Sequence, residues 1–211
     1  MLFNIPSGIP SAMSFGRHHA DHHNFLNEMY KDTDLPLPFE SKWSLDHWWY
    51  RYFYYSFLFL YYTLRPIFCV GKGRLQNDEI FNLFFIIFTN YLLYRYLGPY
   101  VLVYGIFAGL MAVGPHPVTA HMISEHCEFI EGVETNDYIG FVNYISLNSG
   151  YHVEHHDFPT CPWWLLPKVR EMAPEYYEYL PTHYNYLLVL KTFLFKKNYN
   201  LFNRTIRIPE K

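Results

Sequence analysis

The histidines are the residues whose type and spacing most clearly indicate chemistry in this sequence of 211 residues. The motif HxxHH occurs twice, and its two copies contain the histidines His19, His22, His23, His152, His155 and His156. On a helix, positions i, i+3 and i+4 share one face, so each copy would present three imidazoles in one direction. One copy could bind a single zinc ion or form a solvated face, but two copies predict a shared metal-binding task.

The number of imidazoles indicates a centre with two metal ions. Imidazole suits zinc, copper, iron and nickel, so the ligand type does not name the metal. A catalytic zinc site has three protein ligands and a structural zinc site has four, which is fewer than the two motifs supply. Because the chain has long apolar segments and no carboxylate-rich helical bundle, we favour two iron ions that activate dioxygen. A hydrolase with two zinc ions is the alternative.

A third group of histidines lies at residues 116–126, directly after an apolar segment. His116, His121 and His126 are five residues apart, which rotates successive rings by about 140° on a helix and keeps them from facing one metal together. We predict that His126 is a seventh metal ligand and that His121 supports the ligands from outside the coordination sphere. His116, which precedes a proline, is expected to cap a helix or to pack against neighbouring side chains. Structural roles are expected for the histidines without a partner at ligand spacing, namely His18, His47 and His183.

An acidic residue stands just before the final histidine pair of each HxxHH motif, Asp21 in the first copy and Glu154 in the second. At that helical position the side chain points away from the ligand face, toward a neighbouring element. Imidazoles that bind a metal usually donate their other ring N–H to a carboxylate or a carbonyl. We therefore predict that Asp21 and Glu154 accept these N–H groups and orient the ligating rings.

The elements that must position the histidines include two apolar segments, residues 80–98 and 99–114. The first contains two asparagines and one arginine, the second has no charged residue, and Gly98-Pro99 breaks the chain between them. Two apolar segments with a tight break predict a transmembrane helical hairpin. Two buried helices of a soluble protein are the alternative interpretation.

Residues 48–66 are rich in aromatic side chains, but the uncharged run between Arg51 and Arg65 is shorter than the about 20 residues that a spanning helix needs. Tryptophan and tyrosine suit the headgroup layer of a membrane, where one end of the ring is hydrated. We therefore predict an interfacial helix. If this helix does not cross the membrane, two crossings remain between the two HxxHH motifs, at residues 80–98 and 99–114. An even number of crossings leaves both motifs on the same side of the membrane, as a shared metal site requires.

The composition narrows the remaining possibilities. Hydrophobic residues make up 51% of the chain and aromatic residues 21%, more than in an ordinary soluble domain. A net charge of -3 provides no basic surface for nucleic acid, and three widely separated cysteines indicate neither a disulfide framework nor a zinc ribbon. We expect a mainly α-helical integral membrane protein, in which a transmembrane hairpin and an interfacial helix carry a cytosolic, histidine-rich helical cap.

Four segments resemble the membrane fatty-acid desaturase superfamily and, within it, the sphingolipid (dihydroceramide) Δ4-desaturases. They are residues 4–23 with the first HxxHH motif, DTDLP at residues 32–36, residues 114–126, and residues 148–181 with the second HxxHH motif. The resemblance covers nearly the whole chain and keeps order and spacing. It implies a single desaturase-like domain over residues 1–211.

By this resemblance the enzyme uses two iron ions, dioxygen as co-substrate and electrons from a cytochrome b5-type partner. It would introduce a trans double bond into the sphingoid chain of dihydroceramide, a ceramide-type lipid. It would be a multi-pass protein of the endoplasmic reticulum membrane with cytosolic histidine boxes. A sphingoid or fatty-acyl hydroxylase is one alternative, and a non-catalytic membrane protein that retains partial metal binding is another.

One feature of the family has no counterpart in this sequence. The family has a first histidine box of the form HxxxH upstream of the two boxes described above, and no such box precedes His18. We therefore expect the chain to lack the N-terminal part of the enzyme together with two iron ligands. A misplaced start codon, an incomplete gene model and a decayed paralogue would each produce this pattern.

Overall fold

The computed structural model describes residues 1–41, 47–69, 73–114, 116–197, 199–200 and 202–208. These residues are mainly helical, as predicted, and their only strands are the short β1 (Asp137–Tyr138) and β2 (Thr182–His183), which pair in parallel. The chain divides into two compact units. The first combines Met1–Leu37 with Tyr55–Pro115, and the second combines Pro38–Tyr54 with His116–Arg207.

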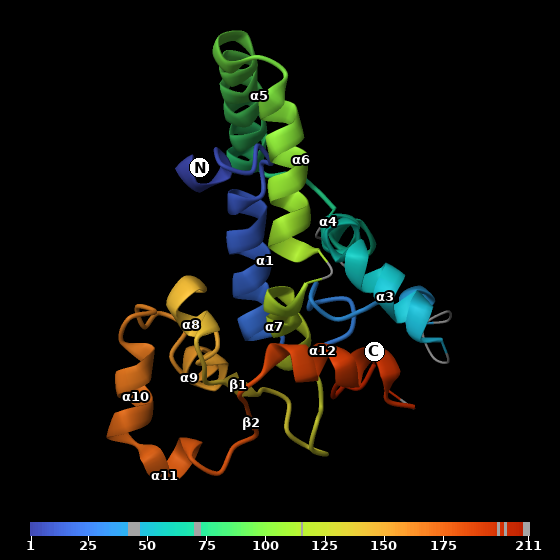
Figure 1. Ribbon diagram of the computed structural model, residues 1–211, viewed down its shortest axis with the longest axis vertical. Helices are drawn as coiled ribbons and strands as arrows, with labels where there is room; N and C mark the ends of the chain where they lie inside the picture. Colours follow the sequence, from blue (N-terminus) through green and yellow to red (C-terminus); the bar gives the residue numbers. More distant parts are fainter. Residues whose placement is uncertain (42–46, 70–72, 115, 198, 201, 209–211) are drawn as a thin grey trace. The chain divides into compact units, whose positions relative to one another are not determined.

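Figure 1 shows the helices coloured along the chain. Those of the first unit are η1 (Leu2–Asn4), α1 (Ala12–Asn24), α4 (Leu58–Phe68), α5 (Asn77–Leu97) and α6 (Tyr100–Val113). Helix α3 (Trp48–Ser56) contains the boundary between the units. Those of the second unit are α2 (Pro38–Ser41), η2 (Pro117–Ala120), α7 (His121–Ser124), α8 (Val142–Ile145), α9 (His152–Asp157), α10 (Leu166–Met172), α11 (Pro174–Tyr177) and α12 (Tyr186–Phe195).

Among the described residues, α5 is the one helix that is long and apolar enough to cross a membrane. Its 21 residues correspond to about 32 Å, close to the about 30 Å of a hydrocarbon core. The helix begins with a capping box between Gln76 and Glu79 and ends at Gly98, whose φ of 79° glycine adopts without steric cost. Helix α5 thus begins three residues before the segment predicted at residues 80–98 and ends one residue before its end.

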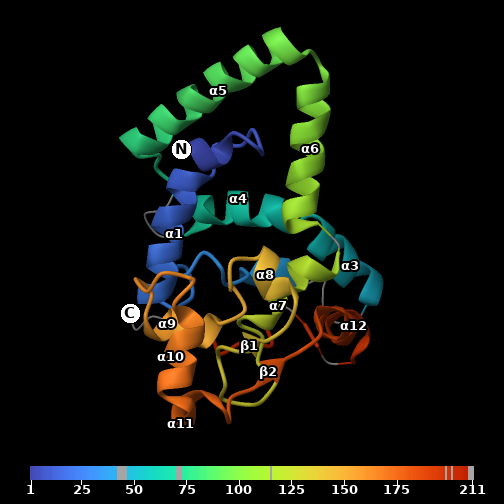
Figure 2. The same ribbon diagram turned by 60° about the vertical axis from the view of Figure 1, so that its left-hand side comes forward.

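Helix α6 follows the Gly98-Pro99 break that the sequence predicted. Its 14 residues correspond to about 21 Å, so it is shorter than α5. The two helices contact each other, and Figure 2 shows that they diverge from their shared corner. The two halves of the predicted hairpin are therefore present as helices, while their crossing of a membrane stays a prediction.

The N-terminal segment lies between α5 and α6 (Figure 2). Asn4 Nδ2 donates to Asn82 Oδ1 at 2.7 Å, and Asn90 Nδ2 donates to the carbonyl of Gly8 at 2.9 Å. On α6, a Cβ at Gly105 would approach a carbonyl of this segment to 3.3 Å, so glycine allows the close approach. The two asparagines in the apolar run of α5 therefore serve the polar groups of this loop.

The interfacial helix predicted at residues 48–66 consists of two helices, α3 and α4, separated at Phe57. The break lies close to the boundary between the two units, so the segment contributes to both. On α3, Trp48, Trp49 and Tyr52 are exposed, whereas Tyr54 and Tyr55 are buried. Location of these helices at a membrane interface stays a prediction.

The two arginines of this segment are buried rather than solvated. In the second unit, Arg51 Nη1 donates to three carbonyls at the C-terminal end of α12 and just beyond it, at distances of 2.8, 3.0 and 2.7 Å. In the first unit, Arg65 Nη1 donates to the carbonyls of Thr33 and Asp34 at 3.3 and 3.0 Å. Each arginine therefore fixes a segment that is distant in the sequence.

The core of the second unit forms around α12, which packs against η2 and α7. Tyr186, Val189 and Phe193 of α12 are buried. The ring of Tyr138 in β1 stacks on Tyr186 with 3.8 Å between the centroids. Strand β1 also contacts α9, so this packing supports the helix that carries the second HxxHH motif.

Candidate metal centre

One candidate metal-binding cluster lies on α1 in the first unit. The rings of His19, His22 and His23 have centroids 4.7, 5.7 and 5.9 Å apart, and the Nε2 atoms of His19 and His23 are 3.2 Å apart. The three rings thus lie together, as the spacing predicted. Burial, and then the neighbouring His23, lower the pKa of His19, which favours a neutral ring with a lone pair for a metal.

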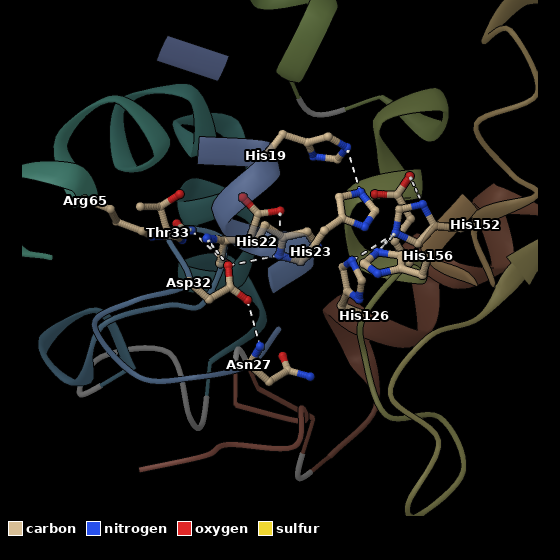
Figure 3. A network of polar contacts seen from close by, with 12 residues as sticks. His19, His22, His23, Asn27, Asp32, Thr33, Arg65, His126, His152 and His156 are labelled. Carbon is tan, nitrogen blue, oxygen red and sulfur yellow. Dashed lines mark hydrogen bonds and ion pairs between the residues drawn. The ribbon is translucent and has the colours of Figure 1, made fainter. Parts of the chain in front are cut away.

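His22 is the buried member of this group, and a carboxylate fixes its ring. Its Nδ1–H donates to Asp32 Oδ1 at 2.9 Å, so Nε2 would be the atom that binds a metal. Asp32 is also buried and accepts the backbone N–H groups of Asn27 and Asp34, each at 2.8 Å (Figure 3). Backbone N–H groups of the loop after α1 therefore fix the carboxylate of Asp32, and this carboxylate fixes the orientation of the His22 ring.

The shape of this loop depends on two unusual backbone conformations and one arginine. Asn27 and Tyr30 have positive φ values of 60° and 66°, which bring the chain back toward α1 within a few residues. The N–H of Asn27 points to Asp32 as a result of this turn. Arg65 of α4 then fixes the carbonyls on the far side of Asp32, as described above.

A second candidate cluster lies in the second unit and joins His126 to two histidines of α9. His126 Nε2 is 2.9 Å from His152 Nε2, and His156 Nε2 is 3.1 Å from His152 Nε2 (Figure 3). His126 Nδ1 lies 3.3 Å from the carbonyl of Glu134, which places the proton on Nδ1 and turns Nε2 toward the other two rings. The structure therefore brings the predicted seventh ligand to the second HxxHH motif.

These distances fit imidazoles that share a metal ion. With metal–nitrogen bonds of about 2.1 Å, two ligand nitrogens on one ion lie roughly 3.0–3.4 Å apart at octahedral or tetrahedral angles. The three facing nitrogen pairs lie 2.9, 3.1 and 3.2 Å apart. The rings of His126 and His152 are also buried, and neutral nitrogen donors suit iron as well as zinc. The donor set of each cluster therefore fits a first-row transition metal.

Glu154 does not have the partner that the sequence predicted. It is fully buried, and its Oε1 accepts from Arg170 Nη1 at 2.9 Å rather than from a histidine ring. The same guanidinium binds Asp137 Oδ2 at 2.6 Å, and Asp137 Oδ1 accepts the N–H of Val153 at 2.9 Å. Burial, and then the charge of Asp137, raise the pKa of Glu154. The carboxylate thus fixes α9 as a whole through the ion pair.

The remaining predicted residues occupy less central positions. His155 lies on α9 with its ring centroid 5.8 and 5.9 Å from those of His152 and His156. His121 Nδ1 bonds to the carbonyl of Val118 at 2.9 Å, and within the described part of the chain it makes no hydrogen bond to another histidine. Asp21 is partly exposed on α1. The supporting roles of His121 and Asp21 therefore stay predictions.

Comparison with known proteins identifies the family. A family model described as fatty acid desaturase matches residues 1–187. The chain belongs to this desaturase family. Both HxxHH motifs and the third histidine group fall within the part of the chain that matches the desaturase model. The resemblance stated from the sequence is confirmed at the level of the family.

Several curated desaturases are similar to nearly the whole chain. Sphingolipid delta(4)-desaturase DES1 of Xenopus tropicalis is 37% identical over 207 residues, which cover 98% of this chain and 64% of that protein. Sphingolipid delta(4)-desaturase/C4-monooxygenase DES2 of Mus musculus is 36% identical over 209 residues, with 97% and 62% covered. The chain therefore spans less than two thirds of the length of these relatives. No solved structure matches the chain.

Sequence reasoning missed Asp32, Asp137 and Arg170 as residues that support the desaturase histidines. Asp32 belongs to the DTDLP segment, whose resemblance to the family was the available signal. Nothing in its spacing marks it, because the intervening turn brings it back to His22. Arg170 and Asp137 lie on either side of α9 in the sequence, and only folding brings them together at Glu154.

Proposed function

We propose that the chain carries two histidine clusters of a membrane-bound, di-iron, dioxygen-dependent desaturase that acts on the sphingoid chain of dihydroceramide. Support comes from ring nitrogens that face each other at 2.9–3.2 Å, in a chain 37% identical to a sphingolipid delta(4)-desaturase. The proposed ligands, shared between two iron ions, are His19, His22, His23, His126, His152, His155 and His156.

In this proposal the chain positions the ligand atoms and fixes their protons. The Nδ1–H groups of His22 and His126 are held by Asp32 and by the carbonyl of Glu134, so both Nε2 atoms stay available for a metal. Arg170 holds the helix that carries the second motif through Glu154. When bound, the metal pair would supply the oxidation of an unactivated C–H bond by dioxygen.

A second candidate function is hydroxylation at the same lipid position. One group of relatives carries the name sphingolipid delta(4)-desaturase/C4-monooxygenase, so relatives of similar identity include proteins named for both outcomes. Desaturation removes two hydrogens from adjacent carbons, whereas hydroxylation replaces one hydrogen with OH. The mass of the lipid product distinguishes the two functions.

We further propose that α5 and α6 form a transmembrane hairpin in the endoplasmic reticulum membrane, with both HxxHH motifs cytosolic and electrons supplied by a cytochrome b5-type partner. The length and apolar surface of α5 support the first crossing. Asn24→Cys and Thr160→Cys variants, in a Cys161→Ser background, should both react with an impermeant reagent added to the cytosolic side. Reaction from opposite sides would contradict the hairpin and, with it, the shared metal site.

The test of activity is a chimera with a full-length relative. This chain would replace the aligned 207-residue segment of the Xenopus tropicalis enzyme, and the chimera would be expressed in cells that lack sphingolipid delta(4)-desaturase. We expect unsaturated ceramide, measured by mass spectrometry, if the chain supports desaturation. Hydroxylated product in its place would establish the second candidate function.

A matched control separates loss of metal from loss of folding in the chimera. His152→Ala removes a proposed ligand, whereas His47→Ala removes an exposed histidine that lies outside both clusters. We expect the first variant to lose iron and product, and the second to keep both. Equal activity of the two variants would exclude His152 as a ligand and contradict the proposed centre.

A further inference from the structure

The segment that connects β1 to α9 exposes an unusual number of apolar side chains. Residues 139–151 contain no charged residue. On and around the short helix α8, Phe141 is 75% exposed, Tyr144 84%, Ile145 63% and Leu147 54%. Single apolar residues scattered over a surface are ordinary, but a contiguous exposed group of them marks an interaction site. This loop therefore indicates a surface that binds a partner.

The side chain of Asn143 and several backbone groups at the base of this loop are hydrogen-bonded within residues 138–151. The side chain of Asn143 donates to the carbonyl of Tyr138 at 2.9 Å and accepts the N–H of Gly150 at 3.0 Å. Gly150 is required here, since a Cβ would collide with both of these partners. Successive backbone turns join residues 140–151. A loop bonded in this way loses little when water leaves its surface.

A second aromatic segment lies against this loop. Asn148 Nδ2 donates to the carbonyl of Trp163 at 3.1 Å, and Trp163 and Trp164 are 43% and 59% exposed. Leu147 and Asn148 both have positive φ values, 53° and 57°, conformations that persist only where the surroundings hold them. The six exposed side chains that we call the aromatic patch are Phe141, Tyr144, Ile145, Leu147, Trp163 and Trp164.

We propose that the aromatic patch docks into the headgroup layer of a lipid bilayer. Tyrosine and tryptophan favour this layer, because the ring is apolar and its polar tip stays hydrated. The nearest exposed basic residue along the chain is Lys168, whose charge suits phosphate headgroups. A protein partner fits less well, since six side chains are far fewer than the about 20–30 residues per side of a specific protein interface.

This proposal rests on the membrane location proposed above and extends it to the second unit. Within the described part of that unit, no helix is long enough to span a bilayer. Docking of the aromatic patch would hold α9 at a fixed depth, because α9 begins directly after Tyr151. The second HxxHH motif would then stay close to the surface from which a lipid substrate arrives.

Fluorescent labels at three positions test the depth of the patch in the full chain. The variants Tyr144→Cys, Tyr179→Cys and Phe88→Cys, each with Cys161→Ser, would carry an environment-sensitive dye in phosphatidylcholine vesicles. Tyr179 is a matched control, since it is an aromatic residue of the second unit that is 89% exposed and outside the patch. Phe88 on α5 reports separately on the membrane location of that helix.

We expect lipids with a spin label near the headgroup to quench the dye at position 144, and aqueous iodide to quench it severalfold less than at position 179. Iodide quenching at position 144 equal to that at position 179 would overturn the proposal. Protection at position 144 without lipid quenching would also overturn it, because the cover would then be protein. Position 88 separates this proposal from the proposed membrane location of the chain. Lipid quenching of the dye at position 88 would support the membrane location even if the aromatic patch does not dock. Absence of lipid quenching at position 88 would refute the membrane location.

Discussion

At the scale of single residues, Asp32 is the most informative addition to the histidine pattern. Its carboxylate connects three backbone or ring N–H groups, and one of them belongs to the proposed ligand His22. An amide at this position would turn an NH₂ group toward one of these donors. Asp32→Asn should therefore weaken metal retention by roughly ten- to a hundredfold, measured as iron content after dialysis against a chelator.

Asp21→Asn tests the ring-orienting role that the sequence assigns to Asp21. The substitution makes the same chemical change on the partly exposed part of α1. If Asp21 accepts a ring N–H, iron retention should fall by a similar factor, roughly ten- to a hundredfold. Unchanged retention in this variant, beside a loss in Asp32→Asn, would contradict the assignment of Asp21 and leave Asp32 as the acceptor.

His183 allows a prediction about pH, because it lies outside both histidine clusters. Burial lowers its pKa, and its ring packs against Phe129 with 4.3 Å between the centroids. As the pH falls through about 6.5, the unfolded chain takes up a proton at this position and the folded chain does not. Stability is therefore lost below that pH. His183→Gln should lose less stability on acidification, measured by denaturant unfolding of the metal-depleted protein.

The unchanged protein, metal-depleted in the same way, supplies the comparison for the pH experiment. A steeper acid loss in His183→Gln than in the unchanged protein would contradict the stated effect of burial.

Pattern alone thus identifies ligand candidates but not the groups that hold them. The i, i+3, i+4 spacing is local, so it survives folding and places the three rings of α1 together. The acceptor of His22 comes from a loop ten residues later, through two positive φ values that no periodicity encodes. Glu154 was wrongly expected to bind a histidine, because its partner Arg170 becomes a neighbour only in the folded unit.

At the scale of elements, Arg51 shows how one side chain of α3 fixes the end of α12, which is distant in the sequence. Its guanidinium binds three carbonyls that close the C-terminal end of α12 and the following turn. Arg51→Met would leave these carbonyls without their donor, at a cost of about 1–3 kcal/mol for each buried group left unsatisfied. We expect faster hydrogen exchange over residues 193–200, measured by mass spectrometry.

Arg74 provides the comparison at this scale, since it is an exposed arginine of the first unit. Arg74→Met should leave exchange over residues 193–200 unchanged. Unchanged exchange in Arg51→Met as well would mean that packing of α12 on η2 and α7 holds the turn without the arginine. The helices α5 and α6 were predictable from sequence because their apolar composition and the Gly98-Pro99 break are local features.

At the scale of the whole molecule, each compact unit contributes one histidine cluster, and the proposed function requires both. If two ions share ligands from the two clusters, removal of one cluster weakens the binding of both ions. His23→Ala or His156→Ala should then lower iron by more than one equivalent per chain. Elemental analysis of the purified protein measures this, and a loss of only one equivalent in each variant would indicate two separate sites.

The ion pairs around the two clusters also set an order in which the centre can be assembled during synthesis. Domains generally fold from the N-terminus as the chain emerges from the ribosome. The cluster on α1 gains its support from Arg65, whereas the cluster on α9 waits for Arg170 and for the strand pairing at Thr182. If the proposed function holds, the second cluster would therefore be loaded with iron late. A nascent chain halted before residue 170 would carry its histidines without the ion pair that fixes them.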